Sequence, residues 1–154
     1  MRMKWIACLA LLLCVGTGIA EGAAGGRPEY EMKEGQYPMQ MKIDETPVTV
    51  TWEDNASVAA LAERAAGGLT IPMSMYGGFE QVGPLGVSLP RDDHQITTVS
   101  GDIVLYSGNQ IVIFYGSNAW AYTRLGHIED QTPSDMRKLL GDRDVTITLR
   151  MDGQ

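Results

Sequence analysis

Residues 101–126 of this 154-residue chain read GDIVLYSGNQIVIFYGSNAWAYTRLG. Two apolar runs, DIVLY and QIVIFY, flank Ser107-Gly108-Asn109, and Gly116-Ser117-Asn118 follows the second run. Short apolar runs bounded by turn residues are typical of strands, and the Gly-Asn pair can supply the positive φ angles that a tight hairpin requires. The stretch therefore predicts a hairpin, and the run AWAYTRLGHI at 119–128 predicts a third strand beside it.

The same stretch holds most of the candidate binding residues. Because alternate residues of a strand point the same way, Trp120, Tyr122 and Arg124 are expected on one face. Phe114, on the neighbouring strand, is expected within side-chain reach of them. Two interpretations remain open: the aromatic residues form the core and rim of a β-fold, or they line an apolar groove with Arg124 as its polar anchor.

Two residues from another segment are expected to complete such a groove. They are Tyr76 and Glu80 of MSMYGGFE at 73–80. A carboxylate such as Glu80 can orient Arg124 through a two-pronged hydrogen bond and leave the other guanidinium donors for a ligand. In the competing interpretation Arg124 is an ordinary surface arginine, stacked on its aromatic neighbours or paired with Glu80 or Glu129.

The strand period continues on both sides of the opening stretch. MQMKID at 39–44 and TPVTVTWE at 46–53 alternate and are rich in β-branched residues, with a bend from Glu45 to Pro47. LTIPMSMY at 69–76 and DVTITLRM at 144–151 predict further strands. Residues 77–101 are rich in Gly, Pro and Asp, which indicates a long excursion with VSL at 87–89 as one possible short strand.

Two segments change to the helical period. Near residues 55–66, Val58, Leu61, Ala62 and Ala65 form one apolar stripe, capped by Asp54 or Asn55 and ended by Gly67. At 133–140, Thr132 is the expected cap, Pro133 takes the first helical position, and Gly141 ends the helix. About eight strands and two short helices favour a mainly β domain over 38–154, built as a closed antiparallel β-barrel.

The first residues have the pattern of an export signal. Arg2 and Lys4 precede an apolar run from Ile6 to Val15, which is too short to span a bilayer, and small residues follow. We expect a signal peptide at 1–20 with cleavage after Ala20, then a flexible linker at 21–37 and a periplasmic or extracellular product. A lipid anchor at Cys14 is the weaker alternative, because bulky Leu13 stands where a small residue is wanted.

The charge and the cysteine content exclude several classes of partner and of chemical site. The chain has 12 basic and 19 acidic residues, and loss of Arg2 and Lys4 with the signal would leave a formal charge of −9. An acidic protein is repelled by nucleic acid and by anionic lipid. Both cysteines, Cys8 and Cys14, would also leave with the signal, so the mature chain would have no disulfide, zinc–thiolate site or cysteine nucleophile.

No cofactor or metal is predicted. The pairs PMQM at 38–41 and PMSM at 72–75 could hold copper(I), which prefers sulfur, but methionine as adaptable core filler is far commoner. His94 and His127 have no second ligand at helical spacing. Asp92, Asp93 and Asp102 show no spacing that indicates acid–base chemistry.

Several of these segments together resemble the cyclophilin-like family of small bacterial proteins. They are WEDN before the first helix, MSMYGGFE, residues 101–130, and the closing GDRDVTITL at 141–149. The resemblance runs from Met39 to Met151 and implies a compact β-barrel of the cyclophilin type. The segments that carry prolyl-isomerase catalysis in the enzymatic cyclophilins, resembling FHR, QGGDF and NGSQFF, are absent, and Arg124 in YTRLG does not match the catalytic arginine.

Two functions therefore remain open. The first is a non-catalytic binding module that holds a small apolar or peptide ligand. The second is a peptidyl-prolyl isomerase that acts on exported proteins, which needs an apolar pocket for the proline ring and a cation that donates to the amide nitrogen. The missing enzymatic segments favour the binding module.

Overall fold

The computed structural model describes residues 37–153, so the expected signal peptide, and the expected linker up to residue 36, lie outside the described residues. The described chain contains eleven strands and two helices. They are β1 (Met39–Ile43), β2 (Thr46–Val48), β3 (Val50–Trp52), α1 (Ala56–Ala65), β4 (Leu69–Pro72), β5 (Ser74–Tyr76), β6 (Glu80–Pro84), β7 (His94–Thr97), β8 (Asp102–Tyr106), β9 (Gln110–Phe114), β10 (Ala119–Ile128), α2 (Pro133–Leu140) and β11 (Thr146–Met151).

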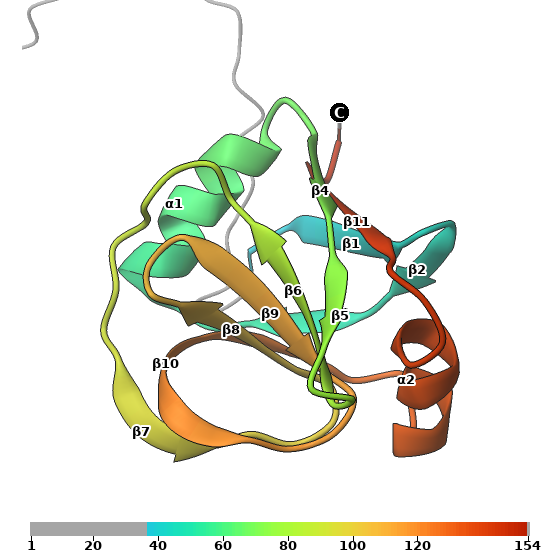
Figure 1. Ribbon diagram of the computed structural model, residues 1–154. Helices are drawn as coiled ribbons and strands as arrows, with labels where there is room; N and C mark the ends of the chain where they lie inside the picture. Colours follow the sequence, from blue (N-terminus) through green and yellow to red (C-terminus); the bar gives the residue numbers. More distant parts are fainter. Residues whose placement is uncertain (1–36, 154) are drawn as a thin grey trace, which may run out of the picture. The chain divides into compact units, whose positions relative to one another are not determined.

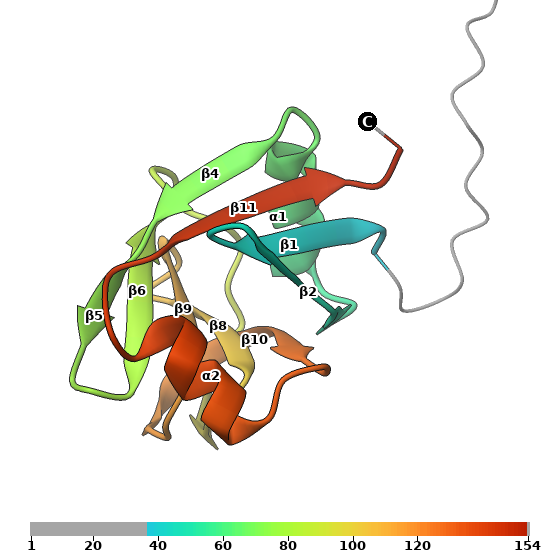
Figure 2. The same ribbon diagram turned by 90° about the vertical axis from the view of Figure 1, so that its right-hand side faces the viewer.

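The strands form two antiparallel sheets (Figure 1). The four-stranded sheet has the order β2-β1-β11-β4, which lie side by side in Figure 2. The seven-stranded sheet has the order β3-β10-β8-β9-β6-β5, and β7 pairs with β10. The mainly β class with two helices is confirmed. The closed barrel is not confirmed, because neither strand order returns to its first strand within the described residues.

The chain passes between the two sheets inside two predicted strands. TPVTVTWE divides at Thr49 into β2, which pairs with β1, and β3, which pairs with β10. LTIPMSMY divides at Met73 into β4, which pairs with β11, and β5, which pairs with β6. The alternation of side chains continues through Thr49 and through Met73, where the chain bends from one sheet to the other. The sequence pattern alone therefore predicts each pair of strands as one strand.

The main core contains side chains from both sheets and from both helices. Leu61 of α1 and Met136 of α2 have no exposed surface, like Ile103 of β8 and Ile147 of β11. Three of the four methionines of the PMQM and PMSM pairs also belong to this core: Met39, Met41 and Met73. Their interpretation as core filler is therefore confirmed.

Both predicted helix caps are present. The side chain of Asn55 accepts a hydrogen bond from the backbone N–H of Val58 at 2.9 Å, which satisfies a donor that the first helical turn leaves open. Thr132 and Asp135 form a capping box at the start of α2, where Pro133 is the first helical residue. Gly141 ends this helix, as expected.

Two local predictions differ from the structure. The hairpin between β8 and β9 has its positive φ angles at Ser107 and Gly108, one position before the expected Gly-Asn pair, because these are the two central residues of the turn. The region 77–101 is less irregular than expected. It contains β6 and β7, while residues 87–89 form no strand.

Within the described residues, neither helix is long and apolar enough to cross a bilayer.

Gly83 in β6 explains why the sequence pattern does not predict this strand. A Cβ atom there would lie 2.7 Å from Ile71 Cγ2 and 3.0 Å from the carbonyl oxygen of Pro72, and it would overlap the sulfur of Met73. The strand can therefore approach the corner between β4 and β5 only with a glycine at this position.

We expect Gly83→Ala to lower the free energy of unfolding by about 1–3 kcal/mol, because the added methyl group overpacks this corner. Urea denaturation followed by circular dichroism measures the change. Gly67→Ala is the matched control, since no atom lies within 4 Å of its Cβ position, and it should change the free energy by less than about 0.5 kcal/mol. Equal losses in the two variants would contradict the close packing at β6.

Candidate ligand-binding site

The central strands β8 and β9 are apolar on both faces. Ile103 and Ile113 point into the main core, whereas Val104 and Val112 belong to a second apolar cluster. Successive side chains of a strand point to opposite faces, so this second cluster lies on the opposite face of the seven-stranded sheet. It consists of Val104, Val112, Phe114 and Tyr122, with Phe79, Val82, Ile96 and Tyr106 packed against it.

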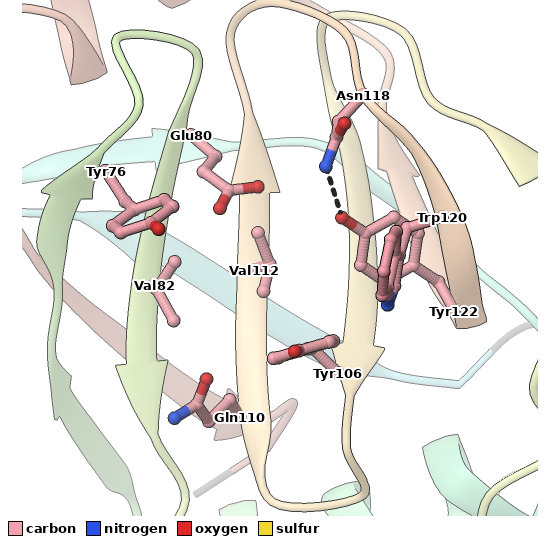
Figure 3. A pocket seen from close by; sticks show the side chains of 9 residues that line it. All are labelled: Tyr76, Glu80, Val82, Tyr106, Gln110, Val112, Asn118, Trp120 and Tyr122. Carbon is pink, nitrogen blue, oxygen red and sulfur yellow. Dashed lines mark hydrogen bonds between the residues drawn. The ribbon is translucent and has the colours of Figure 1, made fainter.

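A pocket of about 400 Å³ opens on this second face (Figure 3). Its size falls within the usual range for small-molecule sites. The nine residues that line it come from five strands and one loop: Tyr76, Glu80, Val82, Tyr106, Gln110, Val112, Asn118, Trp120 and Tyr122.

The pocket runs along β6 and β9. Glu80 lies at one end and Gln110 at the other, while Val82 and Val112, which face each other across the ladder, lie between them (Figure 3). Tyr76 lies on the β5 side and Trp120 on the β10 side. Both aromatic side chains are more than half exposed, so they stand beside the opening instead of being sealed into the core.

The β5–β6 hairpin places Glu80 at its end of the pocket. Gly77 and Gly78 have positive φ angles, which allow the chain to reverse within a few residues. Tyr76 and Glu80 are then paired across the hairpin. The carbonyl oxygen of Phe79 accepts the backbone N–H groups of Tyr115 and Gly116, both at 2.9 Å, which fixes the start of β6 against the end of β9.

The carboxyl group of Glu80 is buried and unpaired. Only 7% of the residue is exposed, and Oε2 has no hydrogen-bond partner within the described chain. Burial raises the pKa of Glu80 from 4.5 to about 7, because removal from water penalises the charged form. Burial also raises the pKa of Tyr115 and of Tyr122, and the charge of Glu80 adds to both shifts.

The opposite wall is held by aromatic contacts and one hydrogen bond. Asn118 Nδ2 donates to the Tyr122 hydroxyl at 2.9 Å (Figure 3). The ring of Tyr122 meets Phe114 edge-on at 5.7 Å between centroids, and Tyr106 at 6.0 Å. These contacts fix the orientation of the Tyr122 ring, so this wall is formed before any ligand arrives.

Arg124 does not take the expected place. It is absent from the pocket lining, and its Nη1 atom lies 3.5 Å from Oδ2 of buried Asp102. The predicted pairing with Glu80 or Glu129 is therefore wrong. The ladder between β10 and β8 shifts register between Arg124 and Gly126, which marks a bulge next to the arginine.

Phe114 and Arg124 are thus the two predicted site residues outside the lining. Phe114 has no exposed surface and packs beneath the wall against Phe79 and Tyr122. The other four predicted residues, Tyr76, Glu80, Trp120 and Tyr122, lie together in the pocket.

Five lining residues were not predicted: Val82, Tyr106, Gln110, Val112 and Asn118. The alternation within β8 and β9 carried a signal for three of them. Tyr106, Gln110 and Val112 follow from the rule that alternate residues share a face, once β9 is known to be apolar on both faces. Asn118 and Val82 had no such signal, because one lies in a turn and the other in the unrecognised β6.

The described residues contain no cluster of three or more His, Cys, Asp or Glu side chains that could hold a metal ion. Two carboxylate–histidine pairs are present among these residues: Asp102 Oδ1 lies 2.8 Å from Nδ1 of His127, and Asp92 Oδ2 lies 3.1 Å from Nε2 of His94. Asp102 also accepts the backbone N–H of Val99 at 2.9 Å, so it serves as a structural acceptor for three groups.

Comparisons with known proteins agree with this fold. The sequence model described as the Cyclophilin-like family matches residues 41–150. A solved structure described as McbB in complex with tryptophan matches with a TM-score of 0.56 and 13% sequence identity. The match covers 75% of this chain and 45% of that chain, so this chain corresponds to less than half of McbB. None of the curated proteins matches the chain.

Because the carboxyl group of Glu80 is buried, we expect the free energy of unfolding to depend on pH. The pKa of Glu80 is about 7 in the folded chain and 4.5 in an ordinary environment, so folding favours its neutral form. Its contribution to the free energy of unfolding is fully present below pH 4.5. The free energy of unfolding then falls as the pH rises through about 7, by up to about 3 kcal/mol. Glu80→Gln removes the ionisation, so its stability relative to the natural protein should increase by that amount from pH 4.5 to pH 8.

Urea denaturation at the two pH values measures this difference. Glu129→Gln, at an exposed carboxyl group, is the control and should show the same pH dependence as the natural protein. If the advantage of Glu80→Gln is the same at both pH values, the carboxyl group is not desolvated as described.

Proposed function

This chain belongs to the cyclophilin-like family, and we propose that its domain is a binding module that holds a small, flat, apolar ligand in the pocket beside β6, β9 and β10. One observation carries the proposal: the second face of the seven-stranded sheet is apolar, and a hollow lies where its cover is incomplete. A sheet face of this kind is stable in water only if it is covered, and here the aromatic side chains cover it in part.

The dimensions and lining of the pocket support a small aromatic compound. About 400 Å³ accommodates a molecule of one or two rings, and Tyr76 and Trp120 offer aromatic surfaces at the opening. The McbB structure contains tryptophan, a molecule of this size. McbB and this chain share the fold, at 13% sequence identity. The tryptophan in the McbB structure therefore supports a small aromatic compound as the class of ligand, and it says nothing about a shared reaction.

The pocket lining does not contain the cation that the isomerase alternative needs. That mechanism requires a cation in the pocket that donates to the amide nitrogen, and Arg124 was the candidate. Arg124 lies outside the lining and is paired with Asp102. The only charged side chain in the lining is Glu80, whose carboxylate cannot act as that donor.

Removal of Trp120 tests the binding proposal. Trp120 is 55% exposed, so Trp120→Ala should change stability little. It should weaken the binding of indole roughly tenfold, because an aromatic contact contributes about 1 kcal/mol beyond its buried area. Ligand-observed NMR titration of the full chain measures the dissociation constant. Val99→Ala is the matched control, since Val99 is 56% exposed and lies outside the pocket.

The control should bind indole as the natural protein does. Equal binding by Trp120→Ala would show that indole binds elsewhere, and no binding to the natural protein at millimolar concentration would contradict the proposed function.

We also propose that the chain is exported, and residues 1–20 alone support this proposal. After expression in a bacterial host, mass spectrometry of the purified product should give a chain that begins at Glu21. A product that begins at Cys14 and carries acyl chains would show that the chain is a lipoprotein instead.

A further inference from the structure

We propose that the ligand is an organic cation, a primary amine joined to a flat apolar body, and that Glu80 binds its nitrogen. This inference rests on the proposed function, because it names the ligand class of the same pocket. The geometry that carries it is a buried, unpaired carboxyl group at one end of an apolar hollow.

The first step concerns the unpaired oxygen. Buried carboxylates in proteins are almost always paired with a cation or held by several hydrogen bonds. Asp102 follows this rule, with His127, Arg124 and the Val99 N–H around it. Glu80 is 7% exposed and does not, since its Oε2 has no partner in the described chain. A partner from outside the chain would complete the same pattern.

The second step is that the protein does not supply this partner itself. The nine lining residues include no lysine, arginine or histidine. Several arginines of the described chain are paired elsewhere, Arg91 with Asp93, Arg124 with Asp102, and Arg143 with Asp44. The other ionisable side chains of the lining are Tyr76, Tyr106 and Tyr122, and the charge of Glu80 also acts on Tyr115, a main-core residue whose hydroxyl has no partner in the described chain.

The third step is the position of the carboxyl group relative to the apolar surface. In Figure 3 Glu80 points toward the middle of the pocket from one end, and Val82 and Val112 lie next to it. A nitrogen bound at Glu80 therefore places its attached ring over the two valines, between Tyr76 and Trp120. The formal net charge of −7 also favours the approach of a cation over that of an anion.

The charge state of Glu80 makes this binding depend on pH. An ammonium group favours the ionised carboxylate, so binding must displace the proton that Glu80 retains below about pH 7. Affinity for the amine should therefore fall as the pH decreases, by roughly tenfold or more from pH 8 to pH 5.5. Affinity for an uncharged ligand of the same shape should change much less over this range.

Three probes that share a phenethyl group test the inference: phenethylamine, phenethyl alcohol and 3-phenylpropionate. Ligand-observed NMR titrations of the full chain at pH 8 give their dissociation constants. We expect the amine to bind about tenfold more tightly than the alcohol, because the ammonium group adds charge–charge attraction to the hydrogen bond that either probe can donate to the ionised carboxylate. The anion should bind most weakly, because it would place a second negative charge beside Glu80.

Glu80→Gln should remove the preference for the amine over the alcohol and the pH dependence of amine binding. Glu129→Gln, at an exposed carboxyl group outside the pocket, is the matched control and should leave all three affinities unchanged. If the natural protein binds the alcohol and the amine equally, or if Glu80→Gln keeps the preference, this inference is wrong and the proposed function stands. If none of the three probes binds at millimolar concentration although indole does, this inference is wrong and the proposed function stands, whereas if indole does not bind either, both are wrong.

Discussion

Strands β8 and β9 carry apolar side chains on both faces, and the other elements of the domain cover them. The four-stranded sheet and the two helices contribute to the core on one side. On the other side the described residues form no second sheet, and Phe79, Tyr106 and Tyr122 cover the face only in part. Burial of apolar surface contributes about 25 cal/mol per Å², so such a face is stabilised by whatever covers it. The pocket lies where that cover is incomplete.

The same sheet holds two buried carboxyl groups in contrasting surroundings. Asp102, at the start of β8, is surrounded by donors that connect β8, β10 and the preceding loop. Glu80, at the start of β6, faces valines and aromatic rings. Burial alone is unfavourable for an ionised carboxylate, and donors offset this cost for the first group only. A carboxyl group that is buried at such a cost usually has a role beyond folding, since an uncharged glutamine has almost the same shape and would avoid this cost.

The sequence was sufficient for elements with a local signal. The helices follow from their caps and apolar stripes, and β8, β9 and β10 follow from apolar runs between turn residues. Trp120 and Tyr122 follow from strand alternation, whereas Tyr76 and Glu80 were expected only as contributions from the MSMYGGFE segment, and the other lining residues were not predicted. The pairing of Arg124 with Asp102 depends on the register between β10 and β8 and on the bulge beside Arg124, which no local pattern encodes. β6 was missed because Gly83 and Pro84 are poor strand residues, and Gly83 is required by a contact distant in sequence.

The pairing of β1 with β11 has a consequence for how the domain forms. This ladder joins Met39 to Met151, near the two ends of the described chain, and β11 also separates β1 from β4. The four-stranded sheet therefore cannot assemble completely until β11 is available. A chain that emerges progressively from a ribosome has the hairpin of β8 and β9 before β11, and it lacks one wall of its core until β11 has emerged. Such long-range pairing slows folding, so the apolar strands remain open to other proteins for longer than in a domain built from local contacts.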